Sequence, residues 1–429
     1  MLGVKDNIFI FKPKRIYVPS LTYFMKILFA HNRYQLAGGE DVVVQAEIAL
    51  LKSNGHEVSG LEVNNDGIVG GWNKAKAAVS AIYSTASRNL LSAEIKRFHP
   101  DVVHIHNFFP LLSPAVYDAC RNAGIPVVQT LHNYRLGCPK AMLFRDGEIC
   151  EDCIGKSVPW PSIIHSCYRS SRTQSAVVAA MIALHQLRNT WHERVNAYIT
   201  LTNFQREKMI QAGLPEEKIY IKPNFICDPG SLVDTGETGE YALFVGRLSE
   251  EKGVSTLIDA YIQLHDIDLP LNIIGDGPLR SSLQERVQVA GLENTIKFMG
   301  QQNKSTVLTL MQNAKFLVFP SIWYEGFPLT LIEAFACSLS VIVPRLGSMT
   351  EIVEDGVTGL FFEAGNAEDL AEKLLWAKAH AQKLLVMGKN ARGRYEAHYT
   401  AEANYQQLLA IYQQVISSTL SNASYPSNL

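Results

Sequence analysis

Short apolar runs alternate with helical patterns along most of this chain. The run KILFAH at 26–31 is followed by a polar loop, by a helical pattern that ends at Gly55, and by a second extended run, EVSGLEV. Two further strand candidates lie at 101–106 and 126–132, with helical segments before and between them. Strands that alternate with helices are typical of a parallel sheet covered on both faces. We therefore predict an α/β fold with doubly wound parallel sheets.

The alternation is interrupted at a stretch rich in Gly, Pro, Asp and Thr, and it starts again with the run YALFVGRL. We interpret 229–240 as a linker between a first Rossmann-like domain at 25–228 and a second at 241–397. Two such domains leave a central cleft, which is the expected place for a ligand. The remaining segment, 398–429, would form a helix that could pack back on the first domain, and a tail.

The composition is that of a globular protein with little net charge. Of 429 residues, 47% are hydrophobic, and 39 basic side chains are offset by 41 acidic ones, which gives a formal net charge of −2. Because no overall field recruits nucleic acid, we expect no nucleic-acid partner, and any bound anion must be held by a local site. The apolar run at 176–184 is far shorter than the roughly 20 residues that span a bilayer.

The first 24 residues carry basic and aromatic side chains but lack the pattern of a secretory signal. We interpret 1–24 as an extension before a fold that begins at MKILFAHN. A cytoplasmic location is expected, and peripheral contact with the inner face of the cell membrane stays open.

Two basic side chains in FVGRLSEEKGV indicate an anion site in the second domain. Arg247 follows an apolar strand, and Lys252 precedes Gly253 and a helix. A guanidinium and an ammonium at the carboxyl end of a parallel sheet can hold a diphosphate. The alternative is a pair of solvated surface charges. The later IIGDGP turn, with Asp276 and Gly277, permits close approach of a ligand to the backbone.

The segment EGFPLTLIEAFA places two acids across the start of a helix. Pro328 suits a first helical turn, and the free peptide N–H groups at this helix mouth suit a phosphate. Glu325, just outside, is placed to accept hydrogen bonds from sugar hydroxyls. Glu333, inside the helix among apolar neighbours, needs donors, which a ribose diol would supply. The alternative for Glu333 is an ion pair or exposure on the outer face of the helix.

The first domain offers a glycine loop and histidines. Gly38 and Gly39 in LAGGED allow the next helix mouth to approach a ligand, although an ordinary tight turn is an alternative and the loop lacks G-x-G-x-x-G. His106 and His132 lie just beyond two predicted strands, where a lone histidine is more often structural. His104, between valine and isoleucine, is expected to be a hydrogen-bonded core residue.

Four of the seven cysteines fall in an insertion at about 136–170 that contains one C-x-x-C pair. In a cytosolic protein this set favours a structural tetrathiolate zinc site, while free thiols, a redox pair or disulfides stay open. These residues are Cys138, Cys150, Cys153 and Cys167. The segment that follows mixes arginines with an apolar helix, which could cover the cleft or rest on a membrane, or be an ordinary buried helix.

The order GRLSEEKG, IIGDGP, PSIWYEGFPLTLIEA and GSMTEIVEDGVTGLFF resembles glycosyltransferase family 4, whose members are retaining, metal-ion-independent enzymes with the two-domain GT-B fold. A subset of that family carries a similar cysteine-bearing insertion. The resemblance implies that Arg247 and Lys252 hold the donor diphosphate, Glu325 the transferred sugar and Glu333 the ribose. The residues expected in the site are, as catalytic groups, His132, Arg247, Lys252 and Glu325; as donor-binding groups, Gly38, Gly39, Gly246, Asp276, Gly277, Gly326, Phe327, Pro328 and Glu333; and as acceptor or pocket lining, His106 and Asn107.

The resemblance therefore predicts transfer of a hexose from a UDP- or GDP-sugar to a glycan or lipid-linked saccharide, in bacterial surface polysaccharide synthesis. No catalytic cofactor and no protein nucleophile is expected, because the cations and the helix mouth would stabilise the departing diphosphate. Two alternatives stay open: a nucleotide-sugar epimerase of the same fold, and a catalytically silent nucleotide-sugar-binding protein.

Overall fold

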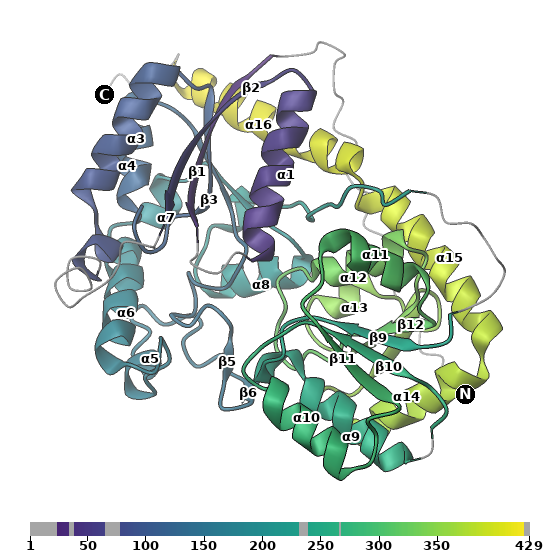
Figure 1. Ribbon diagram of the computed structural model, residues 1–429. Helices are drawn as coiled ribbons and strands as arrows, with labels where there is room; N and C mark the ends of the chain where they lie inside the picture. The colour runs from purple at the N-terminus through teal and green to yellow at the C-terminus, as the bar shows by residue number, and fades with distance from the viewer. Residues whose placement is uncertain (1–23, 34–37, 65–77, 231–238, 266, 424–429) are drawn as a thin grey trace, which may run out of the picture.

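The computed structural model describes residues 24–33, 38–64, 78–230, 239–265 and 267–423. These residues form two domains, each built on a six-stranded sheet with helices packed against it (Figure 1). Most of the predicted extension at 1–24, and most of the predicted linker, lie outside the described residues. No helix in the described part of the chain combines the length and the apolar character needed to cross a bilayer.

The first sheet has the order β2-β1-β3-β4-β7-β8, and all of its pairs are parallel. The chain leaves β1 for one side and then crosses to β3 on the other, so a topological switch point lies beside β1, where ligands of such folds bind. Its strands are β1 (Lys26–Arg33), β2 (Glu57–Asn64), β3 (Val102–Asn107), β4 (Val127–Thr130), β7 (Ala197–Thr200) and β8 (Ile219–Ile221). Its helices are α1 (Gly39–Ser53), α3 (Thr85–Phe98), α4 (Ala115–Ala123), α6 (Arg172–Leu187), α7 (Thr190–Glu193), α8 (Asn203–Gln211) and the 3-10 helix η1 (Glu216–Lys218).

The second sheet repeats this plan in the order β11-β10-β9-β12-β13-β14, again parallel throughout. Here the switch point lies beside β9. The strands are β9 (Ala242–Val245), β10 (Leu271–Ile274), β11 (Ile296–Gly300), β12 (Phe316–Val318), β13 (Val341–Pro344) and β14 (Gly359–Phe362). The helical segments are η2 (Glu250–Lys252), α9 (Val254–Leu264), α10 (Arg280–Val289), α11 (Lys304–Gln312), α12 (Leu329–Ala336), α13 (Met349–Ile352), α14 (Ala367–Ala379) and α15 (Ala381–His398).

The last helix, α16 (Ala401–Ala423), returns to the first domain, as the yellow ribbon in Figure 1 shows. Leu408 and Tyr412 are fully buried in one apolar cluster with Ile27 of β1. The Tyr412 hydroxyl also lies 2.6 Å from Nδ1 of His104. The other nitrogen of that ring, Nε2, lies 2.8 Å from Oγ1 of Thr130, so His104 is a hydrogen-bonded core residue, as the sequence predicted.

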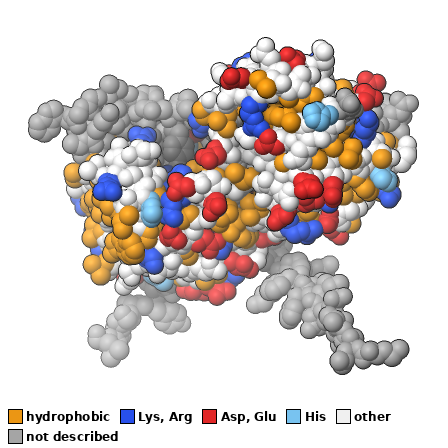
Figure 2. Space-filling model, turned by 90° about the horizontal axis from the view of Figure 1, so that it is seen from below, with side chains coloured by type: hydrophobic (Ala, Val, Ile, Leu, Met, Phe, Trp, Pro, Cys, Tyr) orange, Lys and Arg blue, Asp and Glu red, His pale blue; other side chains and the backbone are white. Residues whose placement is uncertain are grey.

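The cysteine-bearing insertion contains little regular structure. It holds a short antiparallel hairpin, β5 (Phe144–Arg145) with β6 (Glu148–Ile149), and the four-residue helix α5 (Pro161–Ile164). In Figure 1 the hairpin extends from the first domain to the side of α10 in the second. On the face seen in Figure 2, basic and acidic side chains are intermixed, in keeping with the small net charge.

Candidate active site

The start of α12 is an open helix mouth at the surface between the domains. Pro328 occupies the cap position, with φ −74° and ψ 101°, and no side chain caps this end of the helix. We expected Pro328 inside the first turn, and this was wrong by one residue. Because its ψ is extended, Pro328 lies just before the helix, which begins at Leu329. The first N–H groups of α12 lack intrahelical acceptors and carry partial positive charge, which favours an anion.

Glu325 lies directly before this mouth, and its side chain is held by three donors. Its Oε1 atom accepts hydrogen bonds from Lys252 Nζ at 2.6 Å, Ser321 Oγ at 2.7 Å and Trp323 Nε1 at 2.8 Å. The residue is only 6% exposed. Since all three contacts end on Oε1, the Oε2 atom is the one left for a ligand hydroxyl. Lys252, expected at the diphosphate, and Glu325, expected at the sugar, are thus in direct contact.

Lys252 is placed by a glycine that no other residue could replace. Gly253 has φ +64°, and a Cβ there would lie 1.9 Å from the carbonyl oxygen of Pro320. This close approach brings the ammonium of Lys252 within 5.6 Å of the Trp323 ring centre and 5.5 Å of that of Phe319. The ammonium is therefore fixed by aromatic faces and one carboxylate oxygen, in a position to meet an anion at the helix mouth.

Arg247 and the Gly-Asp-Gly turn lie on two loops that touch each other. The N–H of Leu248 donates to the carbonyl oxygen of Asp276 at 3.0 Å, and a Cβ on Gly277 would lie 2.4 Å from the carbonyl oxygen of Leu248. Gly246 likewise donates to Ile274 at 3.0 Å. The Arg247 side chain is exposed and has no hydrogen-bond or ion-pair partner within the described part of the chain, so it is available to a ligand.

The carboxylate of Glu333 is ion-paired in the structure. It contacts Lys304 at the start of α11, and the residue is 9% exposed. The alternative of an ion-paired Glu333 is thus realised here, with a lysine side chain that is itself 57% exposed. A pair with so exposed a partner contributes little to stability and leaves the carboxylate accessible to competing donors.

Residues of the first domain lie close to the start of α12. A Cβ on Gly326 would lie 3.1 Å from the carbonyl oxygen of His132, and one on Gly39 would lie 3.5 Å from Cδ1 of Leu329. The hydroxyl of Tyr134 donates to the carbonyl oxygen of Glu325 at 3.4 Å. The predicted glycine loop, His132 and the acid-bearing segment therefore converge across the cleft. Phe327 is 9% exposed and its ring packs on Tyr399, so only its backbone faces this region.

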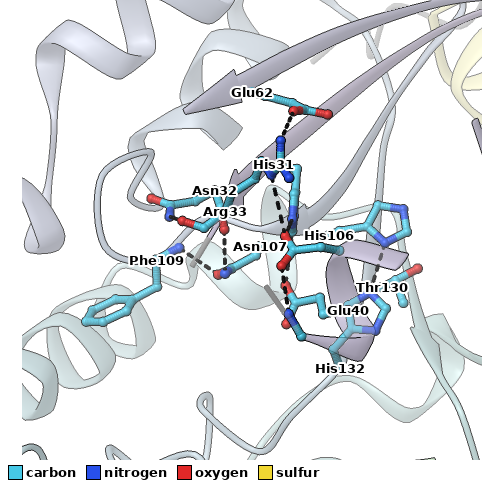
Figure 3. A network of polar contacts seen from close by, with 12 residues as sticks. His31, Asn32, Arg33, Glu40, Glu62, His106, Asn107, Phe109, Thr130 and His132 are labelled. Carbon is cyan, nitrogen blue, oxygen red and sulfur yellow. Dashed lines mark hydrogen bonds and ion pairs between the residues drawn. The ribbon is translucent and has the colours of Figure 1, made fainter. Parts of the chain in front are cut away.

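Figure 3 shows His31, His106 and His132 of the first domain within one network of polar contacts. Nδ1 of His106 lies 2.9 Å from Nε2 of His132, and Nε2 of His106 lies 3.4 Å from Oε2 of the fully buried Glu47. Nε2 of His106 and Oε2 of Glu47 face each other without forming a hydrogen bond, so the hydrogen bond to His106 is the contact that orients the His132 ring. Nδ1 of His132 is the ring nitrogen that His106 does not engage. Burial, with His106 beside it, lowers the pKa of His132 well below 6.5.

The buried carboxylate of Glu47 is paired with Lys222, a residue that no pattern in the sequence singled out. Lys222 Nζ lies 2.5 Å from Oε1 of Glu47, and neither side chain is exposed. Although burial alone would raise it, the Lys222 ammonium and His106 hold the pKa of Glu47 well below 4.5. Glu47, His104 and His106 bring three metal-type ligand atoms within 4.8 Å of one another. Because Lys222 already supplies the cation and both nitrogens of His104 are bonded, this cluster is a structural ion pair.

Sequence reasoning also missed an acid beside the glycine loop. His31 Nε2 lies 2.8 Å from Oδ1 of Asp41, whose other oxygen accepts from the N–H of Gly38 at 3.0 Å. Oε1 of Glu40 is 3.8 Å from His31 Nδ1 and has no hydrogen-bond partner among the residues that the structure describes. Burial, with Asp41 beside it, raises the pKa of Glu40 to about 8. Two adjacent acids after two glycines were the only signal in the sequence.

Asn107, next to His106, forms hydrogen bonds with two backbone groups of the first domain. Its amide nitrogen donates to the carbonyl oxygen of Asn32 at 2.9 Å, and its oxygen accepts from the N–H of Phe109 at 2.9 Å. Asn107, His106 and His132 line one small cavity. A wider depression, of about 760 Å³, lies beside β14 and α14 and contains none of the predicted site residues.

The insertion cysteines line one cavity near the site, with no disulfide among them. Cys153 is 8% exposed, and burial, with Cys138 close by, raises the pKa of its thiol to about 12. We call this set the four insertion cysteines: Cys138, Cys150, Cys153 and Cys167. The sequence predicted that they would come together.

Two family profiles match successive halves of the chain. Residues 37–228 match the profile described as Glycosyltransferase Family 4, and residues 233–394 match the one described as Glycosyl transferases group 1. The chain is a family 4 glycosyltransferase. The fold agrees: the match to Alr3699/HepE of Anabaena, solved with UDP and glucose, covers 93% of this chain and 100% of that one, with a TM-score of 0.64 and 19% identity. The predicted GT-B fold is thereby confirmed.

Relatives among named proteins are glycosyltransferases of diverse substrates. The N-acetyl-alpha-D-glucosaminyl L-malate synthase of Bacillus anthracis is 24% identical over 91% of this chain and 98% of its own length. An uncharacterized glycosyltransferase of Methanocaldococcus jannaschii, MJ1178, is 38% identical over 35% of this chain and 42% of its own length. The phosphatidyl-myo-inositol mannosyltransferase of Mycobacterium leprae is 28% identical over 53% of this chain and 62% of its own length.

Proposed function

We propose that this glycosyltransferase moves a hexose from a nucleoside diphosphate sugar to a glycan or lipid-linked saccharide, with retention and without a catalytic metal ion. One observation carries the proposal: Lys252 and Glu325 are joined at the open mouth of α12, directly opposite His132 and the glycine loop. Cation, helix mouth and sugar-binding acid on one domain suit a donor, and the facing polar groups suit an acceptor.

In the proposed reaction the acceptor oxygen forms a bond to the anomeric carbon while the bond from that carbon to the diphosphate breaks. The acceptor proton passes to the leaving phosphate. Lys252, the exposed Arg247 and the N–H groups of α12 stabilise the charge that develops on the diphosphate. Glu325, through Oε2, and His132, through Nδ1, position hydroxyl groups of the sugar. The surrounding domains exclude water, which limits hydrolysis of the donor.

The relatives support the substrate class. By their names, phosphatidyl-myo-inositol mannosyltransferase acts on a lipid and O-antigen chain mannosyltransferase C of Escherichia coli acts on a glycan chain. D-rhamnosyltransferase WbpZ of Pseudomonas aeruginosa is named for transfer of a sugar. The UDP complex of HepE supports a nucleoside diphosphate donor. We therefore place this chain in bacterial polysaccharide or glycolipid synthesis, with either UDP or GDP on the donor.

A peripheral site on a membrane is consistent with a lipid-linked acceptor. Val158, Trp160 and Ile164 are 48–54% exposed around α5, and Lys156 and Arg169 are exposed beside them. Apolar side chains with a basic rim suit an anionic bilayer surface. Flotation with phosphatidylglycerol vesicles tests this: Trp160→Ser should weaken binding, and equal binding by both proteins would contradict it.

The function is tested with a panel of UDP- and GDP-sugars, incubated with and without a lipid extract as acceptor source. Release of nucleoside diphosphate that rises with the extract, together with a product whose anomeric configuration by NMR equals that of the donor, is the expected result. An altered free nucleotide sugar would instead indicate an epimerase. Stabilisation by nucleotides without turnover of any donor would indicate a binding protein.

A further inference from the structure

The four insertion cysteines come from three separate turns of the insertion and meet at one cavity. Cys138 follows the turn that holds Tyr134, Cys150 and Cys153 flank the turn after β6, and Cys167 follows α5. The N–H of Cys138 donates to the carbonyl oxygen of Tyr134 at 2.8 Å, and that of Cys167 to Ser162 at 2.9 Å. The backbone thus brings cysteines from separate parts of the insertion to one cavity.

The backbone of the insertion needs a constraint that its secondary structure does not supply. Six of the eleven non-glycine residues with positive φ among the described residues lie between 141 and 170, while the segment contains only a hairpin of two-residue strands and one helical turn. Positive φ at such residues costs free energy and persists only where other contacts fix the backbone. Ala141 has φ 69° and Leu143 has φ 51°. Their apolar side chains cannot form the local hydrogen bonds that make this conformation tolerable for Asn or Asp.

The lining of the shared cavity carries positive charge beside the sulfur atoms. The Cys153 thiol donates to the carbonyl oxygen of Pro159 at 3.8 Å, and a bound zinc ion would take the place of its proton. A divalent ion with four thiolates carries a net charge of −2, and Lys140 and Arg145 line the same cavity.

We propose that the four insertion cysteines bind one structural zinc ion that holds the insertion against the second domain. Tetrahedral zinc takes four thiolates at about 2.3 Å, and binding releases the four thiol protons. At that distance the sulfurs approach one another to about 3.8 Å, so the ion draws the four side chains inward across the cavity they share. The sulfurs have not closed to this spacing here, since among the described residues only Glu47, His104 and His106 bring three ligand atoms within 4.8 Å of one another.

The cysteine-bearing insertion approaches the proposed donor site at two places. A Cβ on Gly147, in the turn between β5 and β6, would lie 3.3 Å from Oε1 of Glu250, two residues before Lys252. Glu151, between the paired cysteines, lies 2.7 Å from Lys208 Nζ and contacts the hydroxyl of Tyr324, next to Glu325. The zinc ion would therefore keep these contacts in register with the donor site, although it takes no part in the reaction.

The test uses the full chain, purified under reducing conditions without added metal, and needs no substrate. Elemental analysis by plasma mass spectrometry should find one zinc per chain. An organomercurial should release this zinc as it reacts with the four insertion cysteines. Cys153→Ser should lower the zinc content by at least half, whereas Cys227→Ser, at an exposed cysteine outside the insertion, should leave it unchanged. Chelation should accelerate proteolysis between 138 and 167.

The wild-type measurement decides even if Cys153→Ser fails to fold. A chain that lacks stoichiometric metal after incubation with Zn²⁺, or whose insertion cysteines are found as disulfides by peptide mapping without reduction, would overturn the proposal. The outcome is separate from the proposed function, because a protein that binds zinc and turns over no nucleotide sugar would refute only the latter.

Discussion

His106 fixes the ring of His132 through the 2.9 Å contact between Nδ1 of the first and Nε2 of the second. Replacing His106 by Phe keeps a ring of similar shape but removes this contact, so His132 loses the hydrogen bond that orients its ring. We expect turnover to fall on the order of a hundredfold, the scale of a catalytic group misplaced by about 1 Å. Donor affinity, measured by calorimetry, should change less than about twofold.

The matched control for this variant is His185→Phe. His185 is equally buried and hydrogen-bonded, to Thr190 and to the carbonyl oxygen of Ile82, but it lies outside the site. A similar loss of turnover in both variants would mean that the effect is general destabilisation. Retained turnover in His106→Phe would show that His132 needs no such support.

Lys252→Met tests the cation at the helix mouth. Removing the ammonium should weaken binding of a nucleoside diphosphate and lower turnover by roughly a hundredfold or more, because the leaving group loses a direct electrostatic contact. Titration calorimetry with UDP and GDP measures the first effect, and nucleotide release the second. Lys373→Met deletes an equivalent lysine, which is paired with Asp369 at 3.0 Å on the same domain but away from the cleft. Equal behaviour of the two variants would remove Lys252 from the site.

Variants of Glu333 and Lys304 distinguish a ribose-binding carboxylate from a purely structural ion pair. If the carboxylate binds the ribose, Glu333→Gln should weaken nucleotide binding by roughly tenfold, the worth of a charge-assisted hydrogen bond, whereas Lys304→Gln should not weaken it. If the ion pair is only structural, the two variants should lose the same small stability, at most about 1 kcal/mol for so exposed a pair, and bind nucleotide equally well. Calorimetry and urea unfolding of both variants distinguish the cases.

Local patterns were enough to predict the two-domain scaffold and to single out the residues of the proposed donor side. The strands that flank Arg247 and the helix that carries Glu333 are marked by apolar periodicity and by glycine and proline, which act over a few residues. The buried pair of Glu47 and Lys222 could not be predicted in this way, because its members are 175 residues apart and each resembles a surface charge in the sequence. Their contact exists only once the sheet and α1 are packed.

The same limit explains the cross-domain contacts. Nothing near Tyr134 indicates that its hydroxyl reaches the backbone of Glu325, which is 191 residues away. The carboxylate of Glu351 on α13 accepts from the N–H groups of Asn203 and Phe204 at the start of α8, and thereby ties the two domains together. Such contacts depend on how two finished domains meet, and a one-dimensional pattern carries little information about that.

Glu40 gives the protein a distinctive pH dependence of stability. Burial, with Asp41 beside it, raises the pKa of Glu40 from 4.5 to about 8 in the folded protein. Between these values the unfolded chain has released the proton and the folded chain still holds it, so stability falls as pH rises from 4.5 towards 8. Glu40→Gln carries no such proton. Its melting temperature relative to wild type should therefore rise steadily across this interval and level off above pH 8.

The difference between variant and wild type is the quantity to follow, since other groups titrate in both proteins. His132 acts in the opposite sense: its lowered pKa costs stability only as pH falls below 6.5, and equally in both proteins. Glu285→Gln, at an exposed glutamate of α10, is the control for removal of a carboxylate outside the site. If the difference for Glu40→Gln did not change with pH, the Glu40 carboxyl would ionise normally and its side chain would reach water.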